Sequence, residues 1–110
     1  MEAVRQVERR KHPRAEMRFS VEMELGGTRL VRTGANLSLG GAGFVHPLFL
    51  APGTRLWMNL LLDGGSVRLQ GEVLGEEPVD EDPGRVRFVQ PDPWAHMALT
   101  KCLYEHFKQC

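Results

Sequence analysis

The chain has 110 residues with 14 basic and 14 acidic side chains, so its formal net charge is zero. This length supports one domain around one hydrophobic core, and a neutral protein is not expected to be a general nucleic-acid binder. Because residues 1–6 lack the apolar core of a signal peptide and no segment approaches the roughly 18 apolar residues of a membrane span, we expect a cytoplasmic protein without membrane insertion.

Residues 1–14 are predicted to form a flexible, arginine-rich arm. They show little apolar periodicity, and Pro13 disfavours helix at the residue before it. The first 18 residues contain three acidic side chains and six basic ones, the latter being Arg5, Arg9, Arg10, Lys11, Arg14 and Arg18. A basic segment on a neutral protein is typical of a site for a compact anion, although a solvated basic tail explains the same pattern.

The next segments have the alternating pattern of β-strands. In residues 15–25 five apolar side chains share one face of the extended chain, namely Met17, Phe19, Val21, Met23 and Leu25. Gly26 and Gly27 then form a two-residue hairpin turn, and residues 28–36 return as the second strand.

Four later segments are also predicted to be strands. Residues 54–62 are long enough for a short helix, but the turn residues 63–65 and the alternating run at 66–74 favour a hairpin. Shorter strands are expected at residues 43–46 and 85–89.

One amphipathic helix is predicted at the end of the chain. Asp92 and Pro93 form a helix-start signal, and apolar residues then recur at helical spacing to about residue 108. About six short strands with one terminal helix predict a mainly β protein, a small antiparallel barrel or sandwich that this helix caps, over residues 15–110.

A polar, glycine-rich stretch lies between the second and third expected strands. Asn36 and Ser38 are two residues apart, so their side chains share one face of an extended chain. Glycines at positions 40, 41 and 43 leave bare backbone beside them, which allows a close approach. Such a surface suits a phosphate or the polar edge of a ring better than it suits a protein core.

Two motifs resemble the signature of the PilZ domain family. Arg10-Lys11-His12-Pro13-Arg14 is similar to the family's Arg-x-x-x-Arg element, and Asn36-Leu37-Ser38-Leu39-Gly40-Gly41 is similar to its Asp/Asn-x-Ser-x-x-Gly element. The segment Gly84-Arg85-Val86-Arg87-Phe88 and the terminal helix also look like family features. The resemblance covers almost the whole chain. It implies a six-stranded antiparallel barrel with a C-terminal helix that binds the bacterial second messenger cyclic di-GMP.

The resemblance also implies which residues bind this ligand. Arg10 and Arg14 would hold guanine edges and phosphates, and Arg9 is associated with binding of a stacked ligand dimer. Asn36 and Ser38 would hydrogen-bond the guanine or a phosphate, while the glycine that closes the second motif would leave room for the ring. The expected ligand-binding residues are therefore Arg9, Arg10, Arg14, Asn36, Ser38, Gly40 and Gly41.

Neither a metal site nor an enzyme is expected. Cys102, His106 and Cys110 lie near one helical face, but they are three ligands without a fourth nearby. Ser38 has no histidine or acid at a motif spacing, so nucleophilic catalysis is not indicated. We predict no catalytic residue, no metal and no cofactor besides the cyclic di-GMP ligand.

Two further groups of residues have simple structural interpretations. The acidic residues Asp80, Glu81 and Asp82 are predicted to form a solvated turn. Trp57 and Trp94 are interpreted as core or barrel-end residues.

Two functions follow as hypotheses. The first is a receptor that binds cyclic di-GMP, orders its arginine arm and signals to a partner protein in motility, adhesion or exopolysaccharide control. The alternative is a PilZ-like protein-interaction module that acts without ligand. The intact motif residues favour the receptor. Met97 and Tyr104 widen the apolar face of the helix, which makes this face a candidate surface for a partner protein or for a homodimer.

Overall fold

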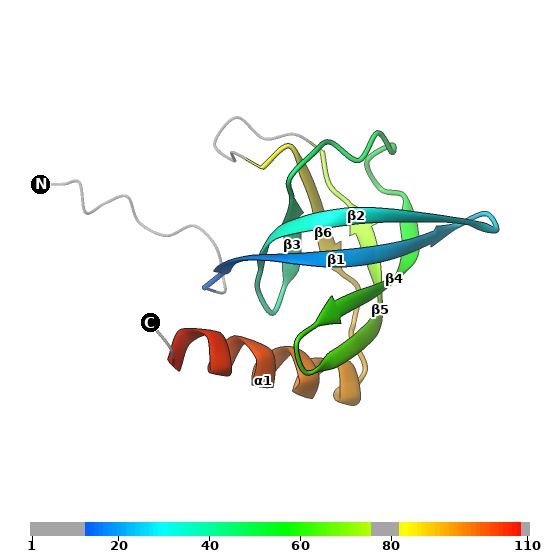
Figure 1. Cartoon of the computed structure of the whole chain (residues 1–110). Helices are drawn as coiled ribbons and strands as arrows, with labels where there is room; N and C mark the ends of the chain where they lie inside the picture. Colours follow the sequence, from blue (N-terminus) through cyan, green and yellow to red (C-terminus); the bar gives the residue numbers. More distant parts are fainter. Residues whose placement is uncertain (1–12, 76–81, 109–110) are drawn as a thin grey trace, which may run out of the picture.

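The computed structural model of the chain describes residues 13–75 and 82–108 (Figure 1). The strands in these ranges are β1 (Ala15–Leu25), β2 (Thr28–Leu37), β3 (Gly41–Phe44), β4 (Arg55–Leu62), β5 (Gly65–Val73) and β6 (Gly84–Phe88), and the helix is α1 (Pro93–Lys108). Residues 1–12 of the expected flexible arm lie outside the described residues.

The strands form a closed antiparallel barrel in the order β1-β2-β3-β6-β5-β4. Pairing of β1 with β4 closes the barrel, with Val21 opposite Leu60 and Met23 opposite Met58. These residues face inward because side chains alternate between the two faces of a strand. The predicted mainly β fold with one C-terminal helix is confirmed, and of the two architectures it is the barrel.

Two hairpins form as their turn residues predict. Gly26 and Gly27 have φ angles of 56° and 82°, the left-handed backbone that a two-residue hairpin loop needs. Figure 1 shows this β1–β2 hairpin extending beyond the body of the barrel. In the second hairpin Leu62 pairs with Gly65, so residues 54–62 contain a strand and not a helix.

The helix α1 packs one stripe of residues against the barrel, beneath β1 and the β4–β5 hairpin (Figure 1). Ala95, Leu99 and Leu103 are the buried residues of this stripe, spaced four residues apart. They join the core that the inward side chains of the strands form. The barrel and the helix therefore share one hydrophobic core.

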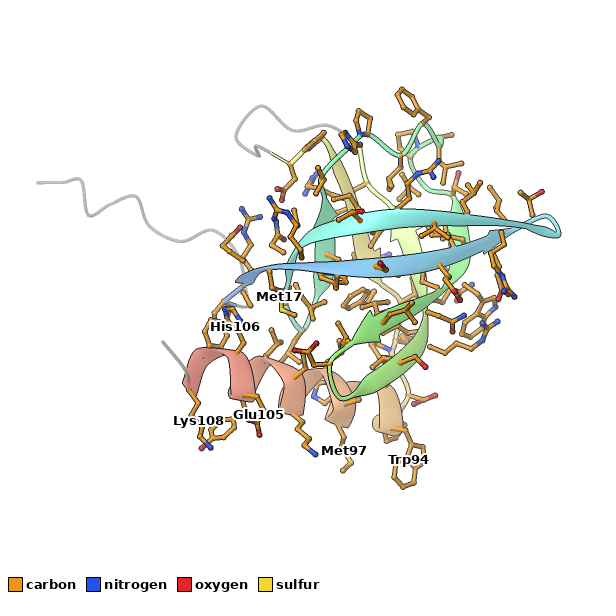
Figure 2. All side chains as sticks on the ribbon, viewed as in Figure 1. Met17, Trp94, Met97, Glu105, His106 and Lys108 are labelled. Atoms are coloured by element: carbon orange, nitrogen blue, oxygen red, sulfur yellow. The ribbon has the colours of Figure 1, made fainter. Side chains whose placement is uncertain are left out.

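Neither tryptophan belongs to that core, so the interpretation of Trp57 and Trp94 as core residues is wrong. The exposed fraction is 79% for Trp94 and 46% for Trp57. Figure 2 shows Trp94 and Met97 pointing away from the barrel, because they lie on the side of α1 opposite its buried stripe. Trp57 occupies an outward position of β4, where the guanidinium of Arg68 lies 5.0 Å from the centre of its ring.

No helix in the described part of the chain is both long enough and apolar enough to cross a membrane.

Candidate functional site

The candidate site begins at Asn36, close to the end of β2, where the strand pairing is irregular on both sides. The register shifts between Glu16 and Phe19 on the β1 side and between Gly34 and Asn36 on the β3 side. Bulges of this kind re-aim side chains and are common next to functional sites. Asn36 is 3% exposed, and its Oδ1 accepts a hydrogen bond of 3.2 Å from the backbone nitrogen of Gly43. That bond fixes the amide orientation, so Nδ2 is the end that faces the site.

The partner of this amide is Asp82, two residues before β6. Asn36 Nδ2 lies 3.0 Å from Oδ1 and 3.0 Å from Oδ2 of the carboxylate. The side chain of Asp82 is only 12% exposed. The prediction of a solvated turn is therefore wrong for Asp82, because its carboxylate has a preformed set of donors to bind. Asp80 and Glu81 lie outside the described residues.

Arg14 is the second donor to the same carboxylate. Its Nη1 lies 2.9 Å from Asp82 Oδ2, and the Arg14 side chain is 18% exposed. Its Nε lies 3.4 Å from Glu16 Oε2, a more exposed carboxylate on β1. A guanidinium offers several donors in a fixed plane, so it can bind two anionic groups at once. The predicted motif residues Arg14 and Asn36 therefore meet at one anion.

Ser38 shapes the turn between β2 and β3. Its Oγ accepts hydrogen bonds of 3.2 Å from the backbone nitrogens of Gly40 and Gly41. Its own backbone nitrogen donates to the Gly41 carbonyl at 2.9 Å. This is the local hydrogen bonding by which a serine side chain stabilises a tight turn. In this structure the hydroxyl therefore stabilises the turn that contains Gly40 and Gly41.

Two glycines of β3 form the floor of the site. A Cβ on Gly43 would overlap the Asp82 carboxylate and the Asn36 amide. Asp82 can therefore lie this close to β3 only because residue 43 is glycine. A Cβ on Gly41 would overlap the carbonyl oxygen of Val86 in the neighbouring β6. Gly41 is therefore required by strand packing, whatever room it also leaves for a ligand ring.

These residues line a cavity of about 440 Å³ on the outside of the barrel, which also receives two arginines of β6. Arg85 pairs with Gly43 across β3 and β6, and Arg87 pairs with Gly41, so both arginines flank the glycine floor. Arg87 Nη2 lies 2.6 Å from Glu72 Oε1, and Arg85 Nη2 donates to the Gly75 carbonyl at 2.8 Å. Arginines therefore border the cavity from two elements: Arg14 directly before β1, and Arg85 and Arg87 on β6.

The structure brings together all of the predicted ligand-binding residues that it describes. The same cavity is lined by Arg14, Asn36, Ser38, Gly40 and Gly41. Arg9 and Arg10 lie outside the described residues, so their placement stays a prediction. Sequence reasoning missed Asp82 and the arginines of β6 as parts of the site, and it named Gly43 as bare backbone without counting it among the ligand-binding residues. The alternation in Gly84-Arg85-Val86-Arg87-Phe88 does place both arginines on one face, but nothing in the sequence joins Asp82 to Asn36.

A second cavity of about 440 Å³ lies between α1 and the β4–β5 hairpin. Met17 and Cys102 line it, and Figure 2 shows Met17 and His106 on facing elements, β1 and α1. Burial raises the pKa of the Cys102 thiol, and the carboxylate of Asp63 raises it further. Within the described residues no group of three histidine, cysteine or acidic side chains is arranged to hold a metal ion. Cys110 lies outside those residues.

A family model matches most of the chain. The model of the PilZ domain covers residues 8–105, which include both motifs, all six strands and most of α1. No match is found among curated proteins.

Solved structures with the same fold include two from Escherichia coli and one from Bacillus subtilis. The PilZ domain of YcgR from E. coli, solved with c-di-GMP, has a TM-score of 0.72 and 18% identity, covering 93% of this chain and 94% of that one. The whole YcgR in complex with c-di-GMP has a TM-score of 0.74 and 20% identity, covering 94% and 48%. The inhibitor of motility MotI/DgrA from B. subtilis has a TM-score of 0.70 and 17% identity, covering 94% and 54%. This chain thus spans about half the length of the whole YcgR and MotI/DgrA chains.

Proposed function

The chain belongs to the PilZ domain family, and on that premise we propose that it is a receptor for cyclic di-GMP that signals to a partner protein. The observation that carries the proposal is that Arg14 and Asn36, one from each family motif, bind the same carboxylate above a glycine floor. A guanidinium and an amide that bind a carboxylate also suit a phosphate, because phosphate oxygens accept the same hydrogen bonds. The site therefore has the donors that an anionic nucleotide needs.

The ligand's own chemistry fits the wider cavity. Cyclic di-GMP carries two phosphates and two guanines, and the O6/N7 edge of guanine accepts hydrogen bonds from an arginine fork. Arg85 and Arg87 border the cavity from β6, opposite the side from which Arg14 enters. We assign Arg14 and Asn36 to the first phosphate or guanine edge and the β6 arginines to the second. The c-di-GMP in the solved PilZ domain of YcgR supports this ligand for the family fold.

The signalling step is proposed to use the remaining arm arginines. Arg10 stands four residues before Arg14 in the sequence, and Arg9 directly precedes Arg10, so we assign both to the ligand that Arg14 holds. Binding then fixes this segment on the barrel and changes the surface offered to a partner. Ser38 Oγ bonds the backbone of Gly40 and Gly41, and we assign no catalytic step to it.

Isothermal titration with cyclic di-GMP tests the receptor function. The parent is expected to bind with a dissociation constant in the micromolar range or lower. Arg10→Ala is expected to bind about 10- to 100-fold more weakly, since a charge-assisted hydrogen bond contributes roughly 1.5–3 kcal/mol. Arg14→Ala is expected to bind more weakly by a smaller factor, because Arg14 is already paired with Asp82 in the free protein. Arg29→Ala, which removes the same charge from an exposed site on β2 that pairs with Glu24, should bind like the parent. Absence of binding by the parent would overturn the proposal.

Two further ligand measurements sharpen this test. Cyclic di-AMP has the same charge and a different base, so it separates guanine recognition from phosphate attraction. A ligand-to-protein ratio near two would support the role assigned to Arg9, whereas a ratio of one would remove it. All titrations need one salt concentration, because exposed charges are screened over a distance of about 10 Å at 0.1 M salt.

The ligand-independent interaction module is the second candidate function. The observation that favours it is the exposed apolar face of α1, which includes Trp94 and Met97 (Figure 2), Tyr104 and Phe107. Such a face is typical of a contact surface for another protein or a second copy. Sedimentation velocity with and without cyclic di-GMP tests the homodimer. Association without ligand that Met97→Ala abolishes would support the module, and a monomer under both conditions would overturn the homodimer.

A further inference from the structure

We propose that Asp82 is an internal competitor for the ligand site, which holds the ligand-binding donors in the free protein and thereby sets the affinity. The inference rests on the proposed function in taking cyclic di-GMP as the ligand that displaces it. The competition itself concerns any anion that needs Arg14 and Asn36. Asp82 is the residue that the sequence interpretation assigned to a solvated turn.

The geometry of the competitor is that of a bound ligand. The carboxylate accepts one hydrogen bond from Arg14 at 2.9 Å and a pair from Asn36 Nδ2 at 3.0 Å each. It is 12% exposed, and it lies so close to Gly43 that no Cβ fits between them. These are the same donors and the same glycine floor that the motifs offer to an anionic ligand. An anion therefore already occupies them.

An incoming phosphate cannot use these donors while the carboxylate keeps them. Each N–H donates to one acceptor at full strength, and two anions a few ångströms apart repel each other in a partly buried site. A guanidinium can bind two anions at once, but a ligand that needs the Nη1 donor of Arg14 or the amide of Asn36 must displace the Asp82 carboxylate from them. Phosphate and carboxylate are similar partners for a guanidinium, so one exchange changes the number of charge-assisted bonds little. The net gain comes from the ligand's further contacts in the cavity, such as those to Arg85 and Arg87.

The effect on affinity follows from the population of the open site. The apparent dissociation constant equals the intrinsic one divided by the fraction of molecules whose donors are free. If the carboxylate holds the donors in about nine molecules out of ten, the ligand binds about tenfold more weakly than it would to an open site. Removal of the carboxylate should then strengthen binding, whereas removal of a residue that contacts the ligand weakens it. The sign of the change distinguishes the two roles.

The opposite role for Asp82 is a direct contact with guanine. A carboxylate can accept two hydrogen bonds from the N1–H and N2–H₂ edge of that base, and it would then stay in place when the ligand binds. In that case Asp82→Ala weakens binding of cyclic di-GMP. The loss of cyclic di-GMP binding, opposite in sign to the gain expected for a competitor, would reveal this role.

The experiment titrates four proteins with cyclic di-GMP and, separately, with inorganic pyrophosphate. The proteins are the parent, Asp82→Ala, Asp82→Asn and the control Asp63→Ala, in which an aspartate of the β4–β5 turn is lost. Asp82→Ala is expected to bind both anions about 3- to 30-fold more tightly than the parent. Asp82→Asn keeps the size of the side chain and removes the charge, so it tests the same point if the alanine variant does not fold. Asp63→Ala should bind like the parent, which shows that net charge alone is not the cause.

A second measurement, in a variant that lacks Arg14, shows whether the gain in affinity depends on this arginine. In Arg14→Ala, the further change Asp82→Ala should give a clearly smaller gain, because one of the two donors is already absent. Tighter binding of pyrophosphate by Asp82→Ala supports the competitor even if neither protein binds cyclic di-GMP, an outcome that would overturn the receptor function alone. Weaker or unchanged binding of both anions by Asp82→Ala and Asp82→Asn would overturn the competitor.

Discussion

Asn36 and Asp82 are 46 residues apart in the chain, yet the side-chain nitrogen of Asn36 lies 3.0 Å from both carboxylate oxygens of Asp82. The contact joins the family motif at the end of β2 to the residues that precede β6. It also decides which side-chain type fits at position 36. The amide nitrogen donates to the carboxylate, and the amide oxygen accepts from the backbone of Gly43. An amide can do both, whereas an ionised carboxylate can only accept.

The first prediction concerns an exchange of these two side chains. Asn36→Asp places a carboxylate against that of Asp82 and is expected to lower the free energy of unfolding by about 1–3 kcal/mol. The double variant Asn36→Asp/Asp82→Asn restores one amide and one carboxylate, so it should recover most of the loss. Urea unfolding of the parent, both single variants and the double variant gives the coupling energy. Additive losses would show that the two side chains do not interact as described.

The second prediction compares two glycines. Gly41→Ala would press a methyl group against the carbonyl oxygen of Val86, which is backbone and cannot swing aside. We expect a loss of about 1–3 kcal/mol in the free energy of unfolding. Gly64→Ala is the control, because a Cβ there meets no atom within 4 Å, and it should change stability by less than about 0.5 kcal/mol. Equal urea midpoints for both variants would contradict the packing described at Gly41.

Most of the fold could be predicted because its signals are local. Alternation in residues 15–25 and the paired glycines of the first turn determine β1 and the β1–β2 hairpin, and Asp92-Pro93 marks the start of α1. The sequence predicts β3 two residues too late, because Gly41–Phe44 contains two glycines and has little alternating pattern of its own. Its position depends on pairing with β2 and β6.

The candidate site could be predicted in part for the same reason. Arg14, Asn36 and Ser38 belong to short motifs that can be recognised along the chain. Asp82 cannot be found in this way, because it lies in an acidic segment that resembles a solvated turn. Only the closed barrel brings that segment over Gly43 and beside Asn36. The exposure of Trp94 was missed because helical spacing shows which residues lie near one another on a helix, but not how wide a stripe the barrel covers.

The third prediction concerns the start of α1. Asp92 Oδ1 accepts a hydrogen bond of 2.9 Å from the backbone nitrogen of Ala95, as an N-cap residue does. Asp92→Ala leaves this donor without its cap and is expected to cost about 1 kcal/mol, which corresponds to a fall in Tm of about 4–8 °C for a domain of this size. Asp92→Asn can still accept the bond and should lose much less. Equal values of Tm for both variants would show that the cap does not stabilise α1.

The last prediction concerns the reactivity of Cys102. Burial raises the pKa of its thiol, and the carboxylate of Asp63 adds to the rise. The thiolate is the species that reacts, so at a given pH near 8 a raised pKa leaves less thiolate and slows alkylation. In a Cys110→Ser background, the rate of alkylation by iodoacetamide should reach half its maximum at a higher pH in the folded protein than in urea. Asp63→Asn should move that midpoint down, but by less than unfolding does, because burial is the larger cause. A folded protein whose midpoint equals that of the unfolded chain would show that the thiol is not held in the cavity between α1 and the β4–β5 hairpin.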